Sequence, residues 1–483
     1  MDEVLIGFIV YLVVMLGIGA WSSKDNSNNE DWLLGGRKIN GYLLAFSERA
    51  SGESAWLVLG LPAAALMVGI GELYTAVGSM IGIIVSWVFV AKPLRNETLK
   101  FGALTIPQYL SSRFGDCKVV LLLSSLVTIF FYITYIASGF GAAGTMFEAT
   151  FGIDKNTGML LGAGVVGLYT MIGGFTAVVI TDMVQALLMV AALTILPAVG
   201  IYKMGGIAVF LDKLSLIEDP TYLSLNNGNM GIAAVTFALA GLSWGFGYLG
   251  QPHLLTRYMA MPSDDDIKKG KIVAFTWIGP AFLGAILLGL VAKVTFSQEI
   301  LVAAKILGEG GNSDGLMPFF AKNMVPMLLA GVLISGAIAA MMSTADTQLL
   351  VITSAVTEDL YHRFMGKAPG EKQLLMLSRA ITIVVCVLAL ALAFQWREGV
   401  MAMVSYAWGG LGSTFGPIIV LSLYSAKTNR NGVIAGLLFG SIGTIVWKLQ
   451  LQHIVPERFS IFVLNFVVIY VVSLLTAKKE QSA

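Results

Sequence analysis

The chain has 483 residues, of which 57% are hydrophobic and only 12% are charged. A soluble protein carries roughly 25% charged residues on average, so most of this surface does not face water. The formal net charge of +1 gives no electrostatic reason to expect a nucleic-acid partner. The composition therefore predicts an all-α protein embedded in membrane lipid and excludes an ordinary soluble domain.

Long apolar segments recur along the whole chain. About 18 apolar residues are enough for a transmembrane helix, and counting such segments with their flanks predicts about 13 transmembrane helices. The first, residues 4–21, is expected to be retained, because no basic residue precedes it and no small-residue cleavage motif follows it. The clearest of the others span residues 158–172, 183–201, 272–292, 381–394 and 461–475.

Basic residues are concentrated in alternate connections between these segments. Lys92, Arg95 and Lys100 share one connection, for example, whereas the next contains Lys155 alone. Because the more basic connections face the cytoplasm, we expect a multi-pass protein of the cell's inner (plasma) membrane. Its N-terminus is expected outside and its C-terminus in the cytoplasm, which requires an odd number of spans.

Two of the predicted spans are interrupted by residues that disfavour a regular membrane helix. Residues 43–60 contain the polar stretch S-E-R-A-S-G-E-S at 47–54, and residues 231–251 contain a glycine-rich stretch that begins at 243. The two spans lie five spans apart and so enter the membrane from opposite sides. Matching broken helices in two halves are typical of transporters with inverted repeats, so we expect a five-plus-five inverted repeat.

Gly245, Gly247 and Gly250 have the G-x-G-x-x-G spacing of dinucleotide-binding enzymes. That motif works only between a strand and a helix, whereas these glycines lie inside an apolar span and are followed by Pro252. We therefore expect neither a nucleotide cofactor nor an enzymatic activity. The glycines indicate backbone that faces a cavity, since irregular backbone is tolerated in a membrane only where protein or water covers it.

Glu48, Arg49 and Glu53 lie in a segment that is otherwise fit to span the bilayer. A charge at the centre of a membrane helix costs about 2.5–3.5 kcal/mol, so such residues pair with one another or serve a site. For Glu48 and Arg49 we favour an ion pair. For Glu53, between Ser51 and Ser54, we favour a site for a hard monovalent cation, which takes carbonyl and hydroxyl oxygens.

The ninth span carries a matching set of oxygens. Ala340, Ser343 and Thr344 stand at positions i, i+3 and i+4, and hence on one face of a helix. Small residues also allow close helix packing, but Asp346 has no role in such an interface. We expect the Ala340 carbonyl and the two hydroxyls to complete an oxygen cage around the cation.

Asp182 and three aromatic residues are further candidates. Asp182 is either a residue at a helix N-terminus, where the macrodipole favours it, or part of a second cation site shared with Asp346. Most membrane aromatics belong to interfacial belts or packing. However, Trp244 and Tyr248 flank the glycines, and Tyr135 lies in the middle of a span. Such an aromatic wall suits a small zwitterion with an apolar ring or side chain.

Several short motifs add a family resemblance to these observations. They are W-L-L-G-G-R at 32–37, L-Y-T-M-I-G-G at 168–174, G-Y-L-G-Q-P-H at 247–253, T-E-D-L-Y at 357–361 and S-Y-A-W at 405–408. Together they resemble the sodium/solute symporter family, most closely its bacterial sodium/proline symporters (proline permeases). The resemblance runs from about residue 32 to residue 440.

The resemblance implies a leucine-transporter-like fold within a single transmembrane domain, residues 1–483. One extra helix is expected before the two repeats and two extra helices after them. The expected parts are the extra helix at 4–22, the first repeat at 41–203, the second repeat at 229–424 and the two C-terminal helices at 431–477.

The resemblance also implies site residues. It implies a sodium ion held by backbone oxygens of Ala50 and Glu53 together with Ala340, Ser343 and Thr344, and it assigns Asp182 to a second sodium site of some members. This chain departs from the known proline permeases at Gly52, where they have Asp, and at Asp346, where they have a neutral residue. The substrate is expected to contact Ser51, Gly52, Ser54, Trp56, Tyr135, Trp244, Gly247, Tyr248 and Pro252.

The expected function is sodium-coupled import of L-proline by alternating access. Sodium- or proton-coupled import of another small amino acid, a carboxylate or a sialic acid is the first alternative, with Glu53 as the proton carrier. A membrane solute sensor is the second, although residues 477–483, which follow the last span, are too few for a signalling domain.

Overall fold

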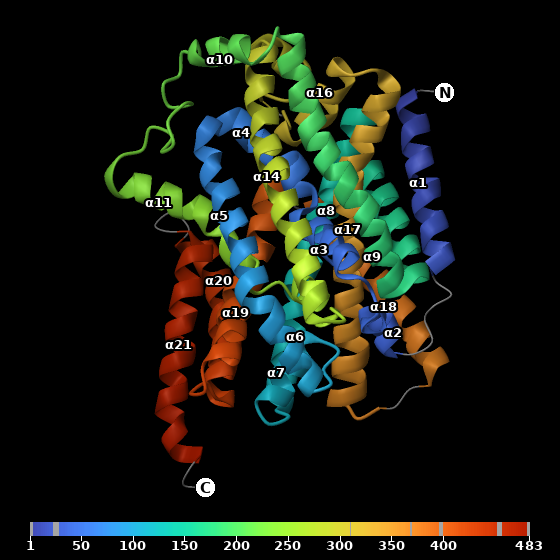
Figure 1. Ribbon diagram of the computed structural model, residues 1–483, viewed down its shortest axis with the longest axis vertical. Helices are drawn as coiled ribbons and strands as arrows, with labels where there is room; N and C mark the ends of the chain where they lie inside the picture. Colours follow the sequence, from blue (N-terminus) through green and yellow to red (C-terminus); the bar gives the residue numbers. More distant parts are fainter. Residues whose placement is uncertain are drawn as a thin grey trace.

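The computed structural model describes residues 3–22, 29–309, 311–367, 370–395, 399–451 and 456–480. Within these ranges every regular element is helical and no strand is present (Figure 1), which confirms the predicted all-α class. Nine of the described helices are long and apolar enough to cross a membrane, or ten if one bent pair counts as a single span. The described residues thus form a multi-pass membrane protein.

The α-helices have the following bounds, in chain order. They are α1 Glu3–Ser22, α2 Asn29–Leu34, α3 Gly41–Ala55, α4 Leu61–Val68, α5 Leu73–Val85, α6 Ala91–Lys100, α7 Ile106–Arg113, α8 Lys118–Phe151, α9 Lys155–Lys203, α10 Ile207–Ser215, α11 Gly231–Leu242, α12 Trp244–Gly247, α13 Pro252–Met259, α14 Asp264–Thr295, α15 Gln298–Ala303, α16 Leu316–Met324, α17 Met327–Ser354, α18 Glu371–Gln395, α19 Val400–Tyr424, α20 Arg430–Gln450 and α21 Glu457–Glu480. π-helical turns cover Trp56–Gly60, Ser86–Val90 and Ala355–Phe364.

Two helical runs are too long for a single crossing. The run from α3 to α6 has 60 residues, or about 90 Å at 1.5 Å per residue. It reverses direction between α4 and α5 (Figure 1), where Gly69 has a φ of 78°. α9 has 49 residues and leaves helical geometry at Gly174, where φ is 63°. The apolar segments 158–172 and 183–201 are the two arms of α9.

Polar caps fix several helix ends. Asp154 Oδ2 accepts hydrogen bonds from the backbone N–H groups of Asn156, at 3.1 Å, and Thr157, at 3.2 Å, where α9 begins. Ser263 Oγ accepts from the backbone N–H of Asp266 at 3.1 Å where α14 begins. Such caps satisfy N–H groups that have no partner inside the helix.

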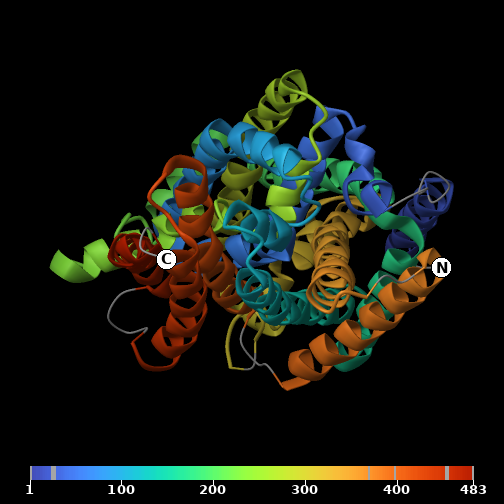
Figure 2. The ribbon, with the colours of Figure 1, turned by 90° about the horizontal axis from the view of Figure 1, so that it is seen from below.

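The centre of the bundle is built around α3. It packs against α9, α14 and α17, while α1, α18, α20 and α21 lie towards the periphery (Figure 2). Small residues allow the closest approaches, as expected for membrane helices. A Cβ on Gly82 in α5 would overlap the backbone of Gly245 in α12. This contact packs the glycine-rich segment directly against α5, which belongs to the first half of the chain.

Candidate ion and substrate site

Both predicted helix interruptions are present in the structure. In α3 the backbone leaves helical geometry at Ser54, with a φ of 39° and a ψ of −164°, and a π-helical turn follows. The second interruption lies between α12 and α13, and the helices on its two sides are bent by 40°. The first break comes at the C-terminal end of the polar stretch 47–54 and not in its middle, because Arg49 and Glu53 pair along an intact helical turn.

Five oxygens from α3 and α17 lie close together. Ser343 Oγ donates to the carbonyl oxygens of Ala50 and Ala340, both at 3.1 Å. Thr344 Oγ1 donates to the carbonyl oxygens of Ser51, at 3.0 Å, and Ala340, at 3.2 Å. All five residues are buried. We call these oxygens of Ala50, Ser51, Ala340, Ser343 and Thr344 the oxygen cluster, and they are of the hard type that an alkali or alkaline-earth cation takes.

Glu53 does not belong to the oxygen cluster. Its carbonyl oxygen accepts a hydrogen bond from the Trp56 backbone N–H. Its carboxylate pairs with Arg49 at 2.8 Å and accepts a hydrogen bond from the Tyr248 hydroxyl at 3.0 Å. Ser51, which was expected at the substrate, supplies the carbonyl oxygen of the cluster that was expected from Glu53.

Glu48 and Arg49 form the ion pair that the sequence predicts. Arg49 Nε donates to Glu48 Oε2 at 2.6 Å, and Glu48 also accepts hydrogen bonds from Trp87 Nε1 at 3.1 Å and Tyr258 Oη at 3.3 Å. With Glu53 the group is a buried triad of one guanidinium and two carboxylates. Each charge has a partner, which is what makes charges tolerable at membrane depth.

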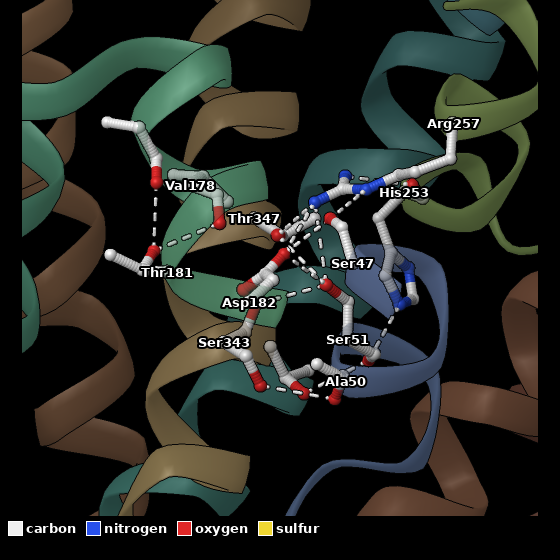
Figure 3. A network of polar contacts seen from close by, with 12 residues as sticks. Ser47, Ala50, Ser51, Val178, Thr181, Asp182, His253, Arg257, Ser343 and Thr347 are labelled. Atoms are coloured by element: carbon white, nitrogen blue, oxygen red, sulfur yellow. Dashed lines mark hydrogen bonds and ion pairs between the residues drawn. The ribbon is translucent and has the colours of Figure 1, made fainter. Parts of the chain in front are cut away.

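A second polar network surrounds Asp182, and Figure 3 shows its side chain facing those of Ser47, Ser51 and Arg257. Asp182 Oδ2 accepts hydrogen bonds from Ser47 Oγ at 2.5 Å and Ser51 Oγ at 3.2 Å, and it pairs with Arg257 Nη2 at 3.2 Å. Arg257 Nη2 also donates to Thr347 Oγ1 at 2.7 Å. The network adjoins the oxygen cluster, because Ser51 belongs to both.

Asp182 is not at a helix N-terminus. It lies two turns beyond Gly174 in the second arm of α9, and a helix dipole acts only within the first turn. The explanation that the macrodipole stabilises Asp182 is therefore wrong. Arg257, its ion-pair partner, was missed as a site residue, because a single arginine in the sequence does not show which carboxylate it will meet.

Asp346 is fully buried in α17 beside this network. Within the ranges that the structure describes, neither of its carboxylate oxygens has a hydrogen-bond partner. It is close enough to Asp182 and Arg257 to interact with both electrostatically. A buried carboxylate without a hydrogen-bond partner is costly, so this position favours a bound cation or proton. No group of three or more His, Cys, Asp or Glu side chains forms a metal site among the described residues.

Aromatic residues from both broken helices meet beyond the oxygen cluster. The Trp56 and Trp244 rings stack with centroids 4.5 Å apart, and Tyr135 Oη donates to Ser54 Oγ at 3.4 Å. A cavity of about 10 Å³ is lined by Ser54, Tyr135 and Thr344 among others, which is room for about one water molecule. Tyr135 and Thr344 of the oxygen cluster thus share one small cavity.

Trp408 holds the second break in place and was not expected at the site. Its Nε1 donates to the Trp244 carbonyl oxygen at 2.9 Å, and its ring meets Tyr248 edge-on with centroids 4.7 Å apart. A Cβ on Gly247 would overlap the Trp408 indole. Pro252 is buried at the start of α13, and Gly52 packs against Leu254 and Tyr248. The motif S-Y-A-W at 405–408 contained Trp408, but its spacing alone does not show that it reaches α12.

Comparison with known proteins shows similarity to one family of transporters along nearly the whole chain. Residues 32–440 match the family described as "Sodium:solute symporter family". The sodium/proline symporter of Escherichia coli (strain K12) is 37% identical over 479 residues, covering 98% of this chain and 93% of that protein. The osmoregulated proline transporter OpuE of Bacillus subtilis is 33% identical over 490 residues, covering 100% of this chain and 96% of that protein.

A solved structure supports the fold. The substrate-bound outward-open state of a Na⁺-coupled sialic acid symporter superposes with a TM-score of 0.82 and 20% sequence identity. The superposition covers 99% of this chain and 98% of that one. At this level of identity the likeness speaks for the fold alone.

Proposed function

The chain belongs to the sodium:solute symporter family, and from this premise we propose that it imports L-proline together with Na⁺ by alternating access. One observation carries the proposal. The oxygen cluster joins α3 to α17 just before α3 breaks at Ser54, and its residue Thr344 lines a small cavity together with Ser54 and Tyr135. The names of the similar proteins, sodium/proline symporter and proline transporter, support the choice of substrate. The substrate crosses unchanged, so no enzymatic step is proposed.

We propose that the coupling Na⁺ binds at the oxygen cluster. The carbonyls of Ala50 and Ala340 and the hydroxyls of Ser343 and Thr344 would be its ligands, with the Ser51 carbonyl in place of the Glu53 carbonyl. The O–O separations of 3.0 to 3.2 Å support this, since hydroxyls that donate to carbonyls can rotate and accept a cation between them.

A second cation is proposed to bind between Asp182 and Asp346. The unpartnered carboxylate of Asp346 supports this proposal, and a proton at the same position is its alternative. Glu53 is the weaker candidate for a proton carrier, because its carboxylate is already paired with Arg49.

Proline is proposed to bind between the two broken helices. Its carboxylate would take the amide and hydroxyl groups freed at Ser54, next to Ser51 and Gly52, and its ring would lie against aromatic side chains once these separate. Gly247, Tyr248 and Pro252 would shape the opposite wall. The proposed ring contacts are Trp56, Tyr135 and Trp244. Trp56 stacks on Trp244 and Tyr135 bonds to Ser54, so these side chains would have to move when substrate enters.

The finer architecture is part of the same proposal. The nine apolar helices become ten with the bent pair. Counting the 60-residue run as two crossings and adding α1 and the first arm of α9 brings the total to about 13 spans. We propose that they form one transmembrane domain with repeats at 41–203 and 229–424, flanked by the helix at 4–22 and, where described, the helices within 431–477. The N-terminus would lie outside and the C-terminus in the cytoplasm.

The proposed mechanism depends on the two helices, α3 and α17, that the bound ion would connect. Na⁺ bound between α3 and α17 would hold the two helices together and order the carbonyls at the break, which prepares Ser54 for the substrate. Rocking of the repeats around this fixed site would then expose it to the other side. Because binding energies are linked, proline must raise the affinity for Na⁺ by the same factor as Na⁺ raises the affinity for proline.

The proposal is tested with the purified protein in proteoliposomes. Labelled proline should accumulate when an inward Na⁺ gradient is imposed and should only equilibrate when the gradient is collapsed. Uptake that is indifferent to the Na⁺ gradient would remove the mechanism. If another amino acid or a sialic acid accumulated and proline did not, the proposed substrate would be wrong, whereas its coupling to Na⁺ would stand.

A further inference from the structure

The Arg49 guanidinium is shared unequally between the two carboxylates of the buried triad. It contacts both oxygens of Glu48, with Nε donating to Oε2 at 2.6 Å and Nη2 pairing with Oε1. Glu53 receives a single contact, from Arg49 Nη1 to Oε1 at 2.8 Å. Because a bidentate pair is stronger than a single contact, Arg49 mainly neutralises Glu48. The triad therefore carries one negative charge in excess, and this charge resides largely on Glu53.

The second carboxylate oxygen of Glu53 has no partner. The side chain is fully buried, and within the part of the chain that the structure describes Oε2 makes no hydrogen bond. Oε1, by contrast, also accepts a hydrogen bond from the Tyr248 hydroxyl at 3.0 Å. Glu48 accepts further hydrogen bonds from Trp87 Nε1 at 3.1 Å and the Tyr258 hydroxyl at 3.3 Å. A buried, unpartnered carboxylate oxygen is costly at membrane depth, so Glu53 Oε2 favours a positively charged donor.

Glu53 lies beside the residues that we propose to contact the substrate. The next residue, Ser54, is where α3 loses its helical geometry. Tyr248, which donates to Glu53, belongs to the proposed opposite wall. Glu53 is also close enough to Tyr135 to interact with it electrostatically, and Tyr135 donates to Ser54 Oγ at 3.4 Å. The excess negative charge is therefore at the proposed substrate site.

We infer that the Glu53 carboxylate binds the positively charged amino group of the substrate. Oε2 would accept a hydrogen bond from the ammonium N–H, which in proline belongs to the ring nitrogen. In an α-amino acid one carbon atom separates the carboxylate from the nitrogen, so the groups that bind them must be neighbours, as Ser54 and Glu53 are. This inference rests on the proposed function, which supplies the site at Ser54.

The inference restricts the class of substrate to solutes with a cationic amino group. An anionic solute without such a group, such as a simple carboxylate or a sialic acid, would bring a second negative charge next to Glu53 and leave Oε2 without a partner. Both effects oppose binding. Glu53 is thus the residue that distinguishes an amino acid from the other solutes considered as substrates.

Competition against labelled proline tests the inference on the purified full-length protein in lipid nanodiscs at saturating Na⁺. The competitor is tetrahydrofuroate, the analogue of proline in which an ether oxygen replaces the ring nitrogen. It keeps the ring and the carboxylate but has neither the N–H groups nor the positive charge. The wild type should bind it about a hundredfold less tightly than proline, or weaker still. Equal affinities for the two compounds would overturn the inference without the need for any variant.

Glu53→Gln removes the charge and keeps an oxygen for the Tyr248 hydroxyl, while Arg49 stays paired with Glu48. Proline affinity should fall about tenfold or more, whereas the affinity for tetrahydrofuroate should stay the same or rise. General damage to the site would weaken both ligands alike, so the ratio of the two affinities isolates recognition of the amino group. A ratio unchanged from that of the wild type would overturn the inference.

Asp359→Asn is the matched control. Asp359 is also fully buried, with one oxygen accepting a hydrogen bond from Thr105 at 2.7 Å and the other unpartnered among the described residues. Its variant should keep the wild-type ratio, and an equal change in both variants would overturn the inference. A Glu53→Gln variant that binds proline normally but binds less Na⁺ would overturn it as well, while the proposed function stands. The absence of Na⁺-dependent proline binding by the wild type would overturn the proposed function itself.

Discussion

Ser343 Oγ donates a hydrogen bond to the carbonyl oxygen of Ala50 at 3.1 Å, although the two residues are 293 positions apart. The contact joins a helix of the first proposed repeat to a helix of the second. It connects them next to Ser54, where α3 loses its helical geometry. A cation that replaces this hydrogen bond would act on both repeats at once, which is how ion binding can control access to the substrate site.

Removing either hydroxyl of the oxygen cluster should weaken Na⁺ binding. Ser343→Ala and Thr344→Ala each delete one ligand, and a contact to a charged group contributes about 1.5–3 kcal/mol. The Na⁺ concentration for half-maximal proline uptake should rise about tenfold or more. Ser335→Ala is the control, because Ser335 is buried on the same helix and, among the residues that the structure describes, bonds only to the Gly331 carbonyl, at 2.8 Å. Wild-type Na⁺ dependence in both cluster variants would show that the ion binds elsewhere.

Asp182 and Arg257 should depend on each other for stability. Breaking a buried ion pair from one side leaves an uncompensated charge and costs about 3–5 kcal/mol. Asp182→Asn and Arg257→Gln should therefore each lower the thermal midpoint in detergent, and the double variant should lower it by less than the sum of the two single effects. A double-mutant cycle over the two positions measures this coupling. Strict additivity would contradict the pairing.

The Asp346 carboxylate should lower the stability of the Na⁺-free fold and should bind a cation during transport. Because its buried carboxylate has no hydrogen-bond partner, Asp346→Asn should raise the free energy of unfolding in Na⁺-free buffer by at least about 1 kcal/mol. The same variant should bind fewer cations per proline, measured by the ratio of ²²Na⁺ to labelled proline taken up. A destabilised variant with unchanged stoichiometry would show that Asp346 is a structural residue.

Gly247 should not tolerate a methyl group. A Cβ there would overlap the Trp408 indole, which holds the Trp244 carbonyl, so Gly247→Ala should displace both rings and cost about 1–3 kcal/mol through overpacking. We expect proline affinity to fall about tenfold. Gly164→Ala in α9 is the matched control, since a Cβ at Gly164 meets no atom within 4 Å. Equal proline affinity in the two variants would refute the role of Trp408.

Local features of the chain predict much of this site. The glycines between Ser243 and Pro252 disfavour a continuous helix, and the structure breaks there. The i, i+3, i+4 spacing of Ala340, Ser343 and Thr344 places their oxygens together, as found. The charges at Glu48 and Arg49 required a partner, and they are each other's partner.

Features that depend on long-range packing were not predictable in the same way. Arg257 reaches Asp182 because α13 packs against α3 and α3 packs against α9, and one basic residue in a sequence does not reveal which carboxylate it will meet. Trp408 binds the Trp244 carbonyl across 164 positions. The carbonyls of Ser51 and Glu53 look alike in the sequence. Their roles differ because residues two positions apart lie on nearly opposite faces of a helix, and the Glu53 carbonyl accepts the Trp56 N–H instead.

The most direct test measures linkage between the ion and the solute in the purified protein. Proline affinity is determined with and without saturating Na⁺, and Na⁺ affinity with and without saturating proline. We expect each ligand to strengthen the other by one common factor, and we expect that factor to fall to about one in the Ser343→Ala, Thr344→Ala double variant. Proline binding that is equally tight in the absence of Na⁺ would contradict coupling between the oxygen cluster and the substrate site.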